Sequence, residues 1–315
     1  MGPYLTQPRK DKDNQDGENS RFKFGATGMQ GWRNTMEDSH IAQLDIGNGI
    51  GFFGVYDGHG GNEVAEFVRD HLVDEFKKLS SFKAGNYEEA LKDIYIHIDE
   101  MLQTTYGKQK LQSYKKNSDS GPSLFGRGGD DIAQGTGCTA TSALITPNEI
   151  IVANSGDSRI VLAVKKGDKY QAIEMSEDHK PDNKGEKARI ERAGGFVEEN
   201  RVKGVLNLSR SLGDLEYKLD SKLSAADQMI TAVPEIRKEK ISSDTAFLVI
   251  ACDGIWDCLT SQESVELFGE LLPKKPKISD AVNEVFDKII ASDVASSGGI
   301  GCDNMTCVVV QFKPQ

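Results

Sequence analysis

The sequence predicts an α+β protein, and two observations carry this prediction. Short segments rich in Val, Ile, Phe and Thr, bounded by Gly, Asn and Asp, follow one another in runs. Segments with helical periodicity are few and do not alternate strictly with those runs. Such a pattern favours α+β architecture over a doubly wound parallel sheet, which needs regular strand–helix alternation.

Seven strands are expected in the chain. They span residues 22–27, 51–56, 139–145, 149–154, 159–164, 245–252 and 305–312. The fourth and fifth of these are separated only by Ser155-Gly156-Asp157-Ser158, and a short turn of this composition predicts a β-hairpin.

Four helices are expected, over residues 62–79, 87–102, 262–272 and 279–292. In the first helix, apolar residues recur every three or four positions and share one face. They are Val64, Phe67, Val68, Leu72 and Phe76. The second helix repeats the pattern with Leu91, Ile94, Ile98 and Leu102.

The chain is expected to form one catalytic domain over residues 22–315, preceded by a flexible arm over residues 1–21. The arm is polar and has no apolar periodicity. Residues 104–134 are dominated by Lys, Ser, Gly and Asp, which predicts a mobile insertion within the domain.

Composition describes an ordinary globular protein of 315 residues with 37% apolar and 28% charged residues. The longest strongly apolar stretch, 246–252, is too short to span a membrane, and no secretory leader precedes it. We therefore expect a monomeric protein of the cytoplasm or nucleus. The net charge of −11 argues against binding to nucleic acid. The five cysteines include no C-x-x-C pair, which argues against a structural zinc site.

Acidic residues recur at the ends of apolar strands. Asp57 and Asp253 each end such a run and are each followed by glycine, and Asp303 directly precedes the last strand. Glu37 and Asp38 stand together just after Arg33. A carboxylate buried at a strand end is costly unless a partner offsets its charge, and several together would form an oxygen-rich site for Mg²⁺ or Mn²⁺. Taken singly, each aspartate also fits an ordinary turn, because Asp-Gly is a common turn pair.

A glycine-rich segment offers a competing interpretation. Residues 135–140 fit the dinucleotide-binding pattern G-x-G-x-x-G/A. That pattern requires a strand before it and a helix after it, whereas here a Gly/Asp-rich loop precedes it and β-branched residues follow. We therefore do not expect a dinucleotide site.

Eight motifs in order resemble the metal-dependent type 2C (PPM) protein serine/threonine phosphatases, over about residues 22–312. They are Met29-Gln30-Gly31-Trp32-Arg33, Met36-Glu37-Asp38, Phe53-Gly54-Val55-Tyr56-Asp57-Gly58-His59-Gly60-Gly61, Gly137-Cys138-Thr139-Ala140, Asn154-Ser155-Gly156-Asp157-Ser158-Arg159, Leu208-Ser209-Arg210-Ser211-Leu212-Gly213-Asp214, Ala251-Cys252-Asp253-Gly254-Ile255-Trp256-Asp257 and Gly301-Cys302-Asp303-Asn304-Met305-Thr306. The resemblance implies an antiparallel β-sandwich flanked on both faces by helices, with a binuclear metal cleft at one end. It also implies a flap over the cleft within about residues 177–228.

The resemblance further implies the ligands of two Mn²⁺ or Mg²⁺ ions. Asp57 matches the carboxylate that bridges both ions. Asp253 and Asp303 match ligands of one ion. Glu37 and the backbone carbonyl of Gly58 match ligands of the other.

Five further residues match functional positions of the family. Asp38 matches a residue that holds a metal-bound water or lies just outside the ligands. Asp157 and Asp257 match positions linked to a third, weaker ion. Arg33 matches the phosphate-binding arginine, and His59 matches the general acid.

The implied reaction is direct attack on phosphoserine or phosphothreonine by a water that bridges the two ions, without a phosphoenzyme. Phosphorylated proteins are the expected substrates. Two alternatives remain open: a two-metal phosphatase of small metabolites, and a catalytically weak scaffold on the same fold.

The first six residues match the myristoylation pattern M-G-x-x-x-[ST], with Gly2 as the acceptor. The pattern is short, and Pro3 is a poor context because it stiffens the segment. If Gly2 is acylated, a single chain gives only weak membrane association, so a membrane-bound fraction is expected beside the soluble protein.

Overall fold

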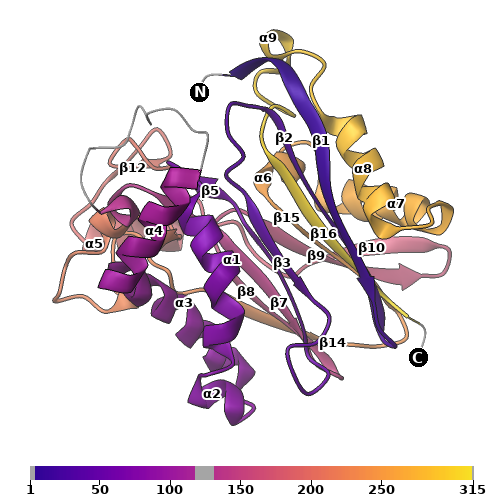
Figure 1. Ribbon diagram of the computed structural model, residues 1–315, viewed down its shortest axis with the longest axis horizontal. Helices are drawn as coiled ribbons and strands as arrows, with labels where there is room; N and C mark the ends of the chain where they lie inside the picture. The colour runs from indigo at the N-terminus through magenta and orange to yellow at the C-terminus, as the bar shows by residue number, and fades with distance from the viewer. Residues whose placement is uncertain (1–3, 118–130, 314–315) are drawn as a thin grey trace.

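Two antiparallel β-sheets packed face to face form the centre of the molecule, in a computed structural model that describes residues 4–117 and 131–313 (Figure 1). The first sheet has, in spatial order, β1 (Tyr4–Glu18), β2 (Phe22–Arg33), β16 (Met305–Phe312), β15 (Thr245–Ala251), β9 (Arg159–Lys166) and β10 (Lys169–Glu174). The second has β14 (Glu235–Lys240), β8 (Glu149–Ser155), β7 (Ala140–Ile145), β4 (Gly51–Tyr56) and β3 (Ser39–Gln43). All neighbouring strands in both sheets are antiparallel.

The core between the sheets is made by inward-facing side chains of both. Phe22 and Phe24 of β2 meet Phe53 of β4, with the Phe22 and Phe53 ring centroids 5.8 Å apart in an edge-to-face arrangement. Leu248 of β15 and Val308 of β16 are also fully buried in this layer. β4 is buried on both faces along its whole length and β16 over residues 305–310, so apolar residues dominate both strands.

Helices cover the outer faces of both sheets (Figure 1). The five-stranded sheet carries α1 (Glu63–Phe76), α2 (Ser80–Lys83), α3 (Tyr87–Gln103) and α4 (Thr105–Asn117). The six-stranded sheet carries α6 (Asp253–Trp256), α7 (Ser261–Leu271) and α8 (Ile278–Ile289), and α9 (Val294–Ser297) follows. In α8 the buried positions Val282, Val285 and Phe286 recur at helical spacing and pack against β2 and β16. The four layers confirm the predicted α+β sandwich.

The remaining elements are short and lie mostly in the segment 177–228. They are α5 (Lys184–Arg192), β11 (Val197–Glu198), β12 (Arg201–Val202) and β13 (Leu212–Gly213), with 3-10 turns at Leu215–Tyr217 and Ala225–Asp227. Two further 3-10 turns lie at Ile132–Gln134 and Leu272–Lys274. A small third sheet joins β13 to β6 (Gly137–Cys138) and β5 (Gly58–His59).

The prediction of a flexible arm over residues 1–21 is wrong for residues 4–18, which form β1. This edge strand pairs with β2 through its backbone and leaves most of its side chains exposed, so it shows no apolar pattern. Its Asp16 carboxylate accepts a hydrogen bond from the Ser279 backbone N–H at 3.0 Å and so caps the start of α8. Gly2, the predicted acylation site, lies outside the described residues.

The prediction of a mobile insertion over residues 104–134 is wrong for the part that forms α4. This helix packs on α1 and α3 with Leu111 fully buried. Its many polar residues lower the apolar signal, because only a narrow stripe of the helix faces the core. Residues 118–130 lie outside the described residues.

The predicted hairpin between β8 and β9 is also wrong. The two strands belong to opposite sheets, and the turn at residues 155–158 carries the chain from one sheet to the other. β8 pairs with β7 and β14, whereas β9 pairs with β15 and β10. The composition of a turn does not determine whether its flanking strands form hydrogen bonds with each other.

Across residues 4–117 and 131–313, the structure contains no helix that is both long and apolar enough to cross a membrane.

Candidate active site

Strand ends and the short helix α6 bring six aspartates together, and we call them the aspartate cluster. They are Asp38, Asp57, Asp157, Asp253, Asp257 and Asp303. Strand register explains the meeting, because Ser39, which follows Asp38, pairs with Tyr56, which precedes Asp57. In the same way Ala251, near Asp253, pairs with both Arg159 and Cys307.

Asp38 and Asp57 form the tightest part of the cluster. One carboxylate oxygen of each and the Cys252 sulfur all lie within 4.8 Å of one another. Both oxygens of Asp38 are buried and have no hydrogen-bond partner in the described structure. A buried carboxylate without a donor calls for a cation, so these oxygens fit a hard divalent ion.

Burial and mutual repulsion raise the pKa of the clustered carboxyl groups. Burial, with repulsion from Asp303, raises the pKa of Asp38 to about 6. Burial and the neighbouring aspartates raise the pKa of Asp57 and Asp253 well above the ordinary range. Burial likewise raises the pKa of Asp257. All four shifts show that added positive charge would stabilise the ionised cluster.

Two cationic side chains contact the cluster. The Arg33 guanidinium pairs with the Asp303 carboxylate at 2.5 Å, and the Lys180 ammonium pairs with Asp157, which is 3% exposed. The six aspartates and Glu37, when ionised, carry seven negative charges, and these two cations reduce them to five, so two divalent ions would offset most of the remaining charge. Sequence reasoning missed Lys180, which lies in the segment 177–228.

Glu37 lies beside the cluster and is held by neutral donors. Its side-chain oxygens accept hydrogen bonds from the Thr35 hydroxyl at 2.7 Å and the Gly61 backbone N–H at 3.1 Å. Its backbone carbonyl accepts from the Gly58 N–H at 3.2 Å. A Cβ atom on Gly58 would stand 2.4 Å from that carbonyl, so only glycine permits this approach.

His59 forms a dyad with Asp214. The ring Nε2 lies 2.8 Å from the Asp214 carboxylate, which also accepts a hydrogen bond from the Ser211 hydroxyl at 2.5 Å. Burial lowers the pKa of His59. The charge of Asp214 and its hydrogen bond raise that pKa by more than burial lowers it, so the net shift is upward. A Cβ atom on Gly137 would meet the Asp214 carboxylate at 2.3 Å, so glycine is needed beside the dyad. Sequence reasoning assigned no role to Asp214, which lies 155 residues from His59.

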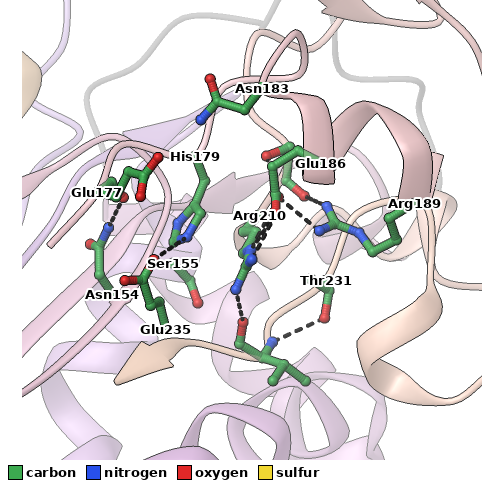
Figure 2. A network of polar contacts seen from close by, with 12 residues as sticks. Asn154, Ser155, Glu177, His179, Asn183, Glu186, Arg189, Arg210, Thr231 and Glu235 are labelled. Atoms are coloured by element: carbon green, nitrogen blue, oxygen red, sulfur yellow. Dashed lines mark hydrogen bonds and ion pairs between the residues drawn. The ribbon is translucent and has the colours of Figure 1, made fainter. Parts of the chain in front are cut away.

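A buried ionic network around Glu186 holds the chain segment just before Asp214 in place (Figure 2). Glu186 of α5 accepts hydrogen bonds from Arg189 at 2.7 Å, from Arg210 at 2.7 Å and from the Ser209 hydroxyl at 2.6 Å. Burial would raise the pKa of Glu186, but hydrogen bonds and charge from the two arginines lower it to about 2. The network therefore stays ionised near neutral pH and fixes the chain just before Asp214.

Cys252 lies among the carboxylates as a neutral thiol. Burial and the charges of Asp38 and Asp57 raise its pKa well above the ordinary value. Its sulfur accepts a hydrogen bond from the Thr306 backbone N–H at 3.2 Å. A protonated thiol is a poor nucleophile, and Cys252 is fully buried.

The glycine-rich segment 135–140 does not form a dinucleotide site in the structure. It runs from the end of a 3-10 turn through β6 into β7, and no helix follows it. The competing interpretation of this motif is therefore excluded by its structural context.

The raised pKa of Asp38 predicts how the stability of the metal-free protein depends on pH. The folded pKa of about 6 lies above the unfolded value of 3.8, so between these values the folded state binds more protons. The free energy of unfolding should therefore fall as pH rises from about 4 to about 6, by about 3 kcal/mol in total. Urea unfolding of chelated protein across this range measures the slope. Asp38→Asn should flatten it, and an equally steep slope in that variant would contradict the assignment.

Comparison with known proteins identifies relatives along the whole chain. Residues 22–298 match the family model described as Protein phosphatase 2C. "Probable protein phosphatase 2C 3" of Paramecium tetraurelia is 45% identical over 317 residues, covering 99% of this chain and 100% of the relative. "Probable protein phosphatase 2C 21" of Arabidopsis thaliana is 42% identical and covers 99% and 93%. The crystal structure of serine-threonine phosphatase 2C from Toxoplasma gondii has the same fold, with a TM-score of 0.74, 20% identity and coverage of 99% and 100%.

Proposed function

Because this chain belongs to the protein phosphatase 2C family, it is a protein serine/threonine phosphatase, and we propose that two Mn²⁺ or Mg²⁺ ions bind in its aspartate cluster. The observation that carries the proposal is the group of buried, mutually repelling carboxylates in which the Asp38 oxygens have no donor. When bound, the ions supply a water of lowered pKa as nucleophile and stabilise charge on the phosphoryl oxygens.

We assign the ligands by combining the family positions with this geometry. Asp57 would contact both ions, because it lies at the centre of the cluster. Asp253 and Asp303 would hold one ion, and Glu37 with the Gly58 carbonyl would hold the other. All five groups offer the oxygen ligands that Mn²⁺ and Mg²⁺ prefer.

The remaining acidic residues have weaker roles in this proposal. Asp38 would orient a water or contact an ion directly, since its oxygens are free to do so. Asp157 and Asp257 would hold a third, weaker ion. Residues 22–315 act as one catalytic domain, and the segment 177–228 forms the flap beside the site.

Arg33 binds the phosphoryl group in this scheme. Its guanidinium is half-buried, pairs with Asp303, and packs over the Tyr4 ring at 5.9 Å from the ring centre. Its planar fork can donate two parallel hydrogen bonds to phosphoryl oxygens, which a lysine cannot match. Substrate binding would exchange part of the Asp303 contact for the phosphate.

Arg33→Ala should raise the KM for phosphopeptide and the inhibition constant for inorganic phosphate together, each by about tenfold. The reason is that both ligands present the same oxygens to the guanidinium. Steady-state kinetics with phosphate as a competitive inhibitor measures both constants. Arg21→Ala, which removes the arginine just before β2, at the other end of the strand from Arg33, serves as the control. Unchanged phosphate inhibition in Arg33→Ala would show that the residue only pairs with Asp303.

His59 supplies the proton that the leaving serine or threonine oxygen needs. Its Nε2 faces Asp214, which favours the charged ring and leaves Nδ1 to donate. Asp214 acts as a positioning residue, because it touches the ring and not the substrate.

The experiment that tests the proposed function is hydrolysis of a phosphothreonine peptide after exhaustive chelation, with and without added Mn²⁺. We expect no turnover in the chelated protein and full recovery with Mn²⁺ or Mg²⁺. Nucleotides and sugar phosphates run beside the peptide as alternative substrates. Faster hydrolysis of those metabolites would favour the metabolite phosphatase, and no turnover on any substrate would favour the scaffold. The expectations of a monomer, of a cytoplasmic or nuclear location and of Gly2 acylation stay predictions.

A further inference from the structure

We propose that Lys180 is a built-in competitor of the third divalent ion: its ammonium occupies Asp157 and must leave before that ion can bind. This inference rests on the proposed function, because it assumes that Asp157 is a ligand of a weak third ion. It goes further by naming the residue of this chain that lowers the affinity for that ion.

The first observation is that Lys180 already fills the place of a cation at Asp157. The ammonium contacts the Asp157 carboxylate directly, although that aspartate is almost fully buried. Lys180 also lies in the electrostatic field of Asp253 and Asp257. These are the same acidic groups that a third ion would need, so the two cations compete for one set of charges.

The second observation is that the backbone holds Lys180 at this point. The His179 N–H donates to the Gly156 carbonyl at 2.9 Å, and the Gly156 N–H donates in return to His179 Nδ1 at 3.3 Å. The Asn154 side-chain amide donates to the carbonyls of both Gly156 and Glu177, as its position beside Glu177 in Figure 2 shows. These bonds place residues 177–180 alongside the turn that carries Asp157.

A salt bridge between Arg159 and Asp178 also holds residues 177–180 beside the turn that carries Asp157. Arg159 donates to both carboxylate oxygens of Asp178, at 2.9 and 2.8 Å. Such a two-bond pair is geometrically specific, so it fixes the relative register of the two segments. Lys180 is therefore presented to Asp157 by its surroundings and does not reach it by chance.

The third observation is that a displaced Lys180 has somewhere to go. A hollow of about 270 Å³ lies beside it, and its walls carry several carboxylates. The lining residues are Arg159, Glu174, Ser176, Glu177, Asp178, Lys180 and Asn183. The ammonium can turn from Asp157 into this hollow and keep an acidic neighbour, so displacement does not leave a lysine charge without a partner.

Charge balance explains why the two cations exclude each other. With two divalent ions bound, Arg33 and Lys180 leave the six aspartates and Glu37 with a net charge of −1. A third divalent ion beside the Lys180 ammonium would make the site positive, and like charges at short range repel. Removing the ammonium lowers that cost and frees the Asp157 oxygen that it contacts for the ion.

Lys180→Met tests the proposal, because methionine keeps an unbranched side chain of similar length and removes the charge. We expect calorimetric titration of the full chain with Mn²⁺ to show two tight ions unchanged and a third ion bound about tenfold more tightly. Lys187→Met is the matched control, since it removes an exposed lysine charge from α5. Lys180→Gln provides a second neutral variant should the first unfold, as judged by thermal unfolding.

A second pair of variants checks whether Lys180 acts on the third ion through Asp157. Adding Lys180→Met to Asp157→Asn should change no Mn²⁺ affinity, because the contested carboxylate is already gone. If Lys180→Met and Lys187→Met bind the third ion equally, or if no third ion binds any variant, the inference is overturned. Failure of the wild-type protein to bind two tight ions would instead overturn the proposed function.

Discussion

Asp57→Asn is expected to remove nearly all phosphatase activity while making the metal-free protein more stable. Asp57 lies at the centre of the cluster and is repelled by four other aspartates. In the enzyme, its charge would contact both ions, so its loss should lower turnover on the order of 10³-fold or more. Without ions, the same charge only adds repulsion in a buried site, so its removal should raise the unfolding midpoint.

Two measurements on chelated and Mn²⁺-loaded protein check this opposition between activity and stability. The midpoint of thermal unfolding should rise in metal-free Asp57→Asn, and added Mn²⁺ should raise it less than in the wild-type protein. Asp253→Asn should behave in the same way, because burial and the charges of Asp157 and Asp303 also raise the pKa of Asp253. Asp287→Asn on α8 is the control, since that exposed carboxylate pairs only with Lys12 among the contacts described for it. Full activity of Asp57→Asn after chelation would contradict the two-ion site.

Burial explains how well the sequence predicts individual elements. The strands β4 and β16 have the bounds predicted from the sequence, 51–56 and 305–312, because most of each strand is covered on both faces and apolar residues dominate it. In contrast, β10 and β14 are edge strands with exposed side chains, and neither is predicted. Their stability comes from backbone pairing with an inner strand, which leaves little trace in the sequence.

Site residues next to apolar strands can be predicted from the sequence, whereas those that reach the site through long-range contacts cannot. Asp57, Asp253 and Asp303 are predicted because each follows or precedes an apolar strand, and strand ends converge when the sheets form. Asp157 and Asp257 are expected only from the resemblance to the phosphatase family. Lys180 and Asp214 are not predicted, because they come from irregular backbone in the segment 177–228 and meet Asp157 and His59 only through long-range contacts. The Glu186 network fixes the chain just before Asp214, and contacts of His179 and Asp178 place Lys180. No periodic pattern in the sequence predicts either set of contacts.

His59→Gln should lower turnover of phosphopeptide by about 10²-fold, yet slow p-nitrophenyl phosphate much less. The difference arises in the leaving group. A serine or threonine alkoxide is a poor leaving group and needs a proton as the bond to phosphorus breaks. Nitrophenolate is stable as an anion and does not need one. Loss of the proton donor should therefore make the rate depend more steeply on the pKa of the leaving group.

The Asp214 contact permits a sharper form of this test. Asp214→Asn keeps the shape of the partner but removes the charge that favours a protonated His59 ring. We expect Asp214→Asn to make the rate depend on the leaving-group pKa as steeply as His59→Gln does. Its loss of phosphopeptide turnover should be smaller than that of His59→Gln, because the imidazole itself remains in place. His97→Gln on α3 is the control for the substitution, since that histidine is partly exposed and contacts Glu75 and Glu100. Equal losses on phosphopeptide and p-nitrophenyl phosphate in His59→Gln would show that the ring positions an ion or the substrate and does not donate the proton. A wild-type dependence on the leaving group in Asp214→Asn would show that the dyad is structural.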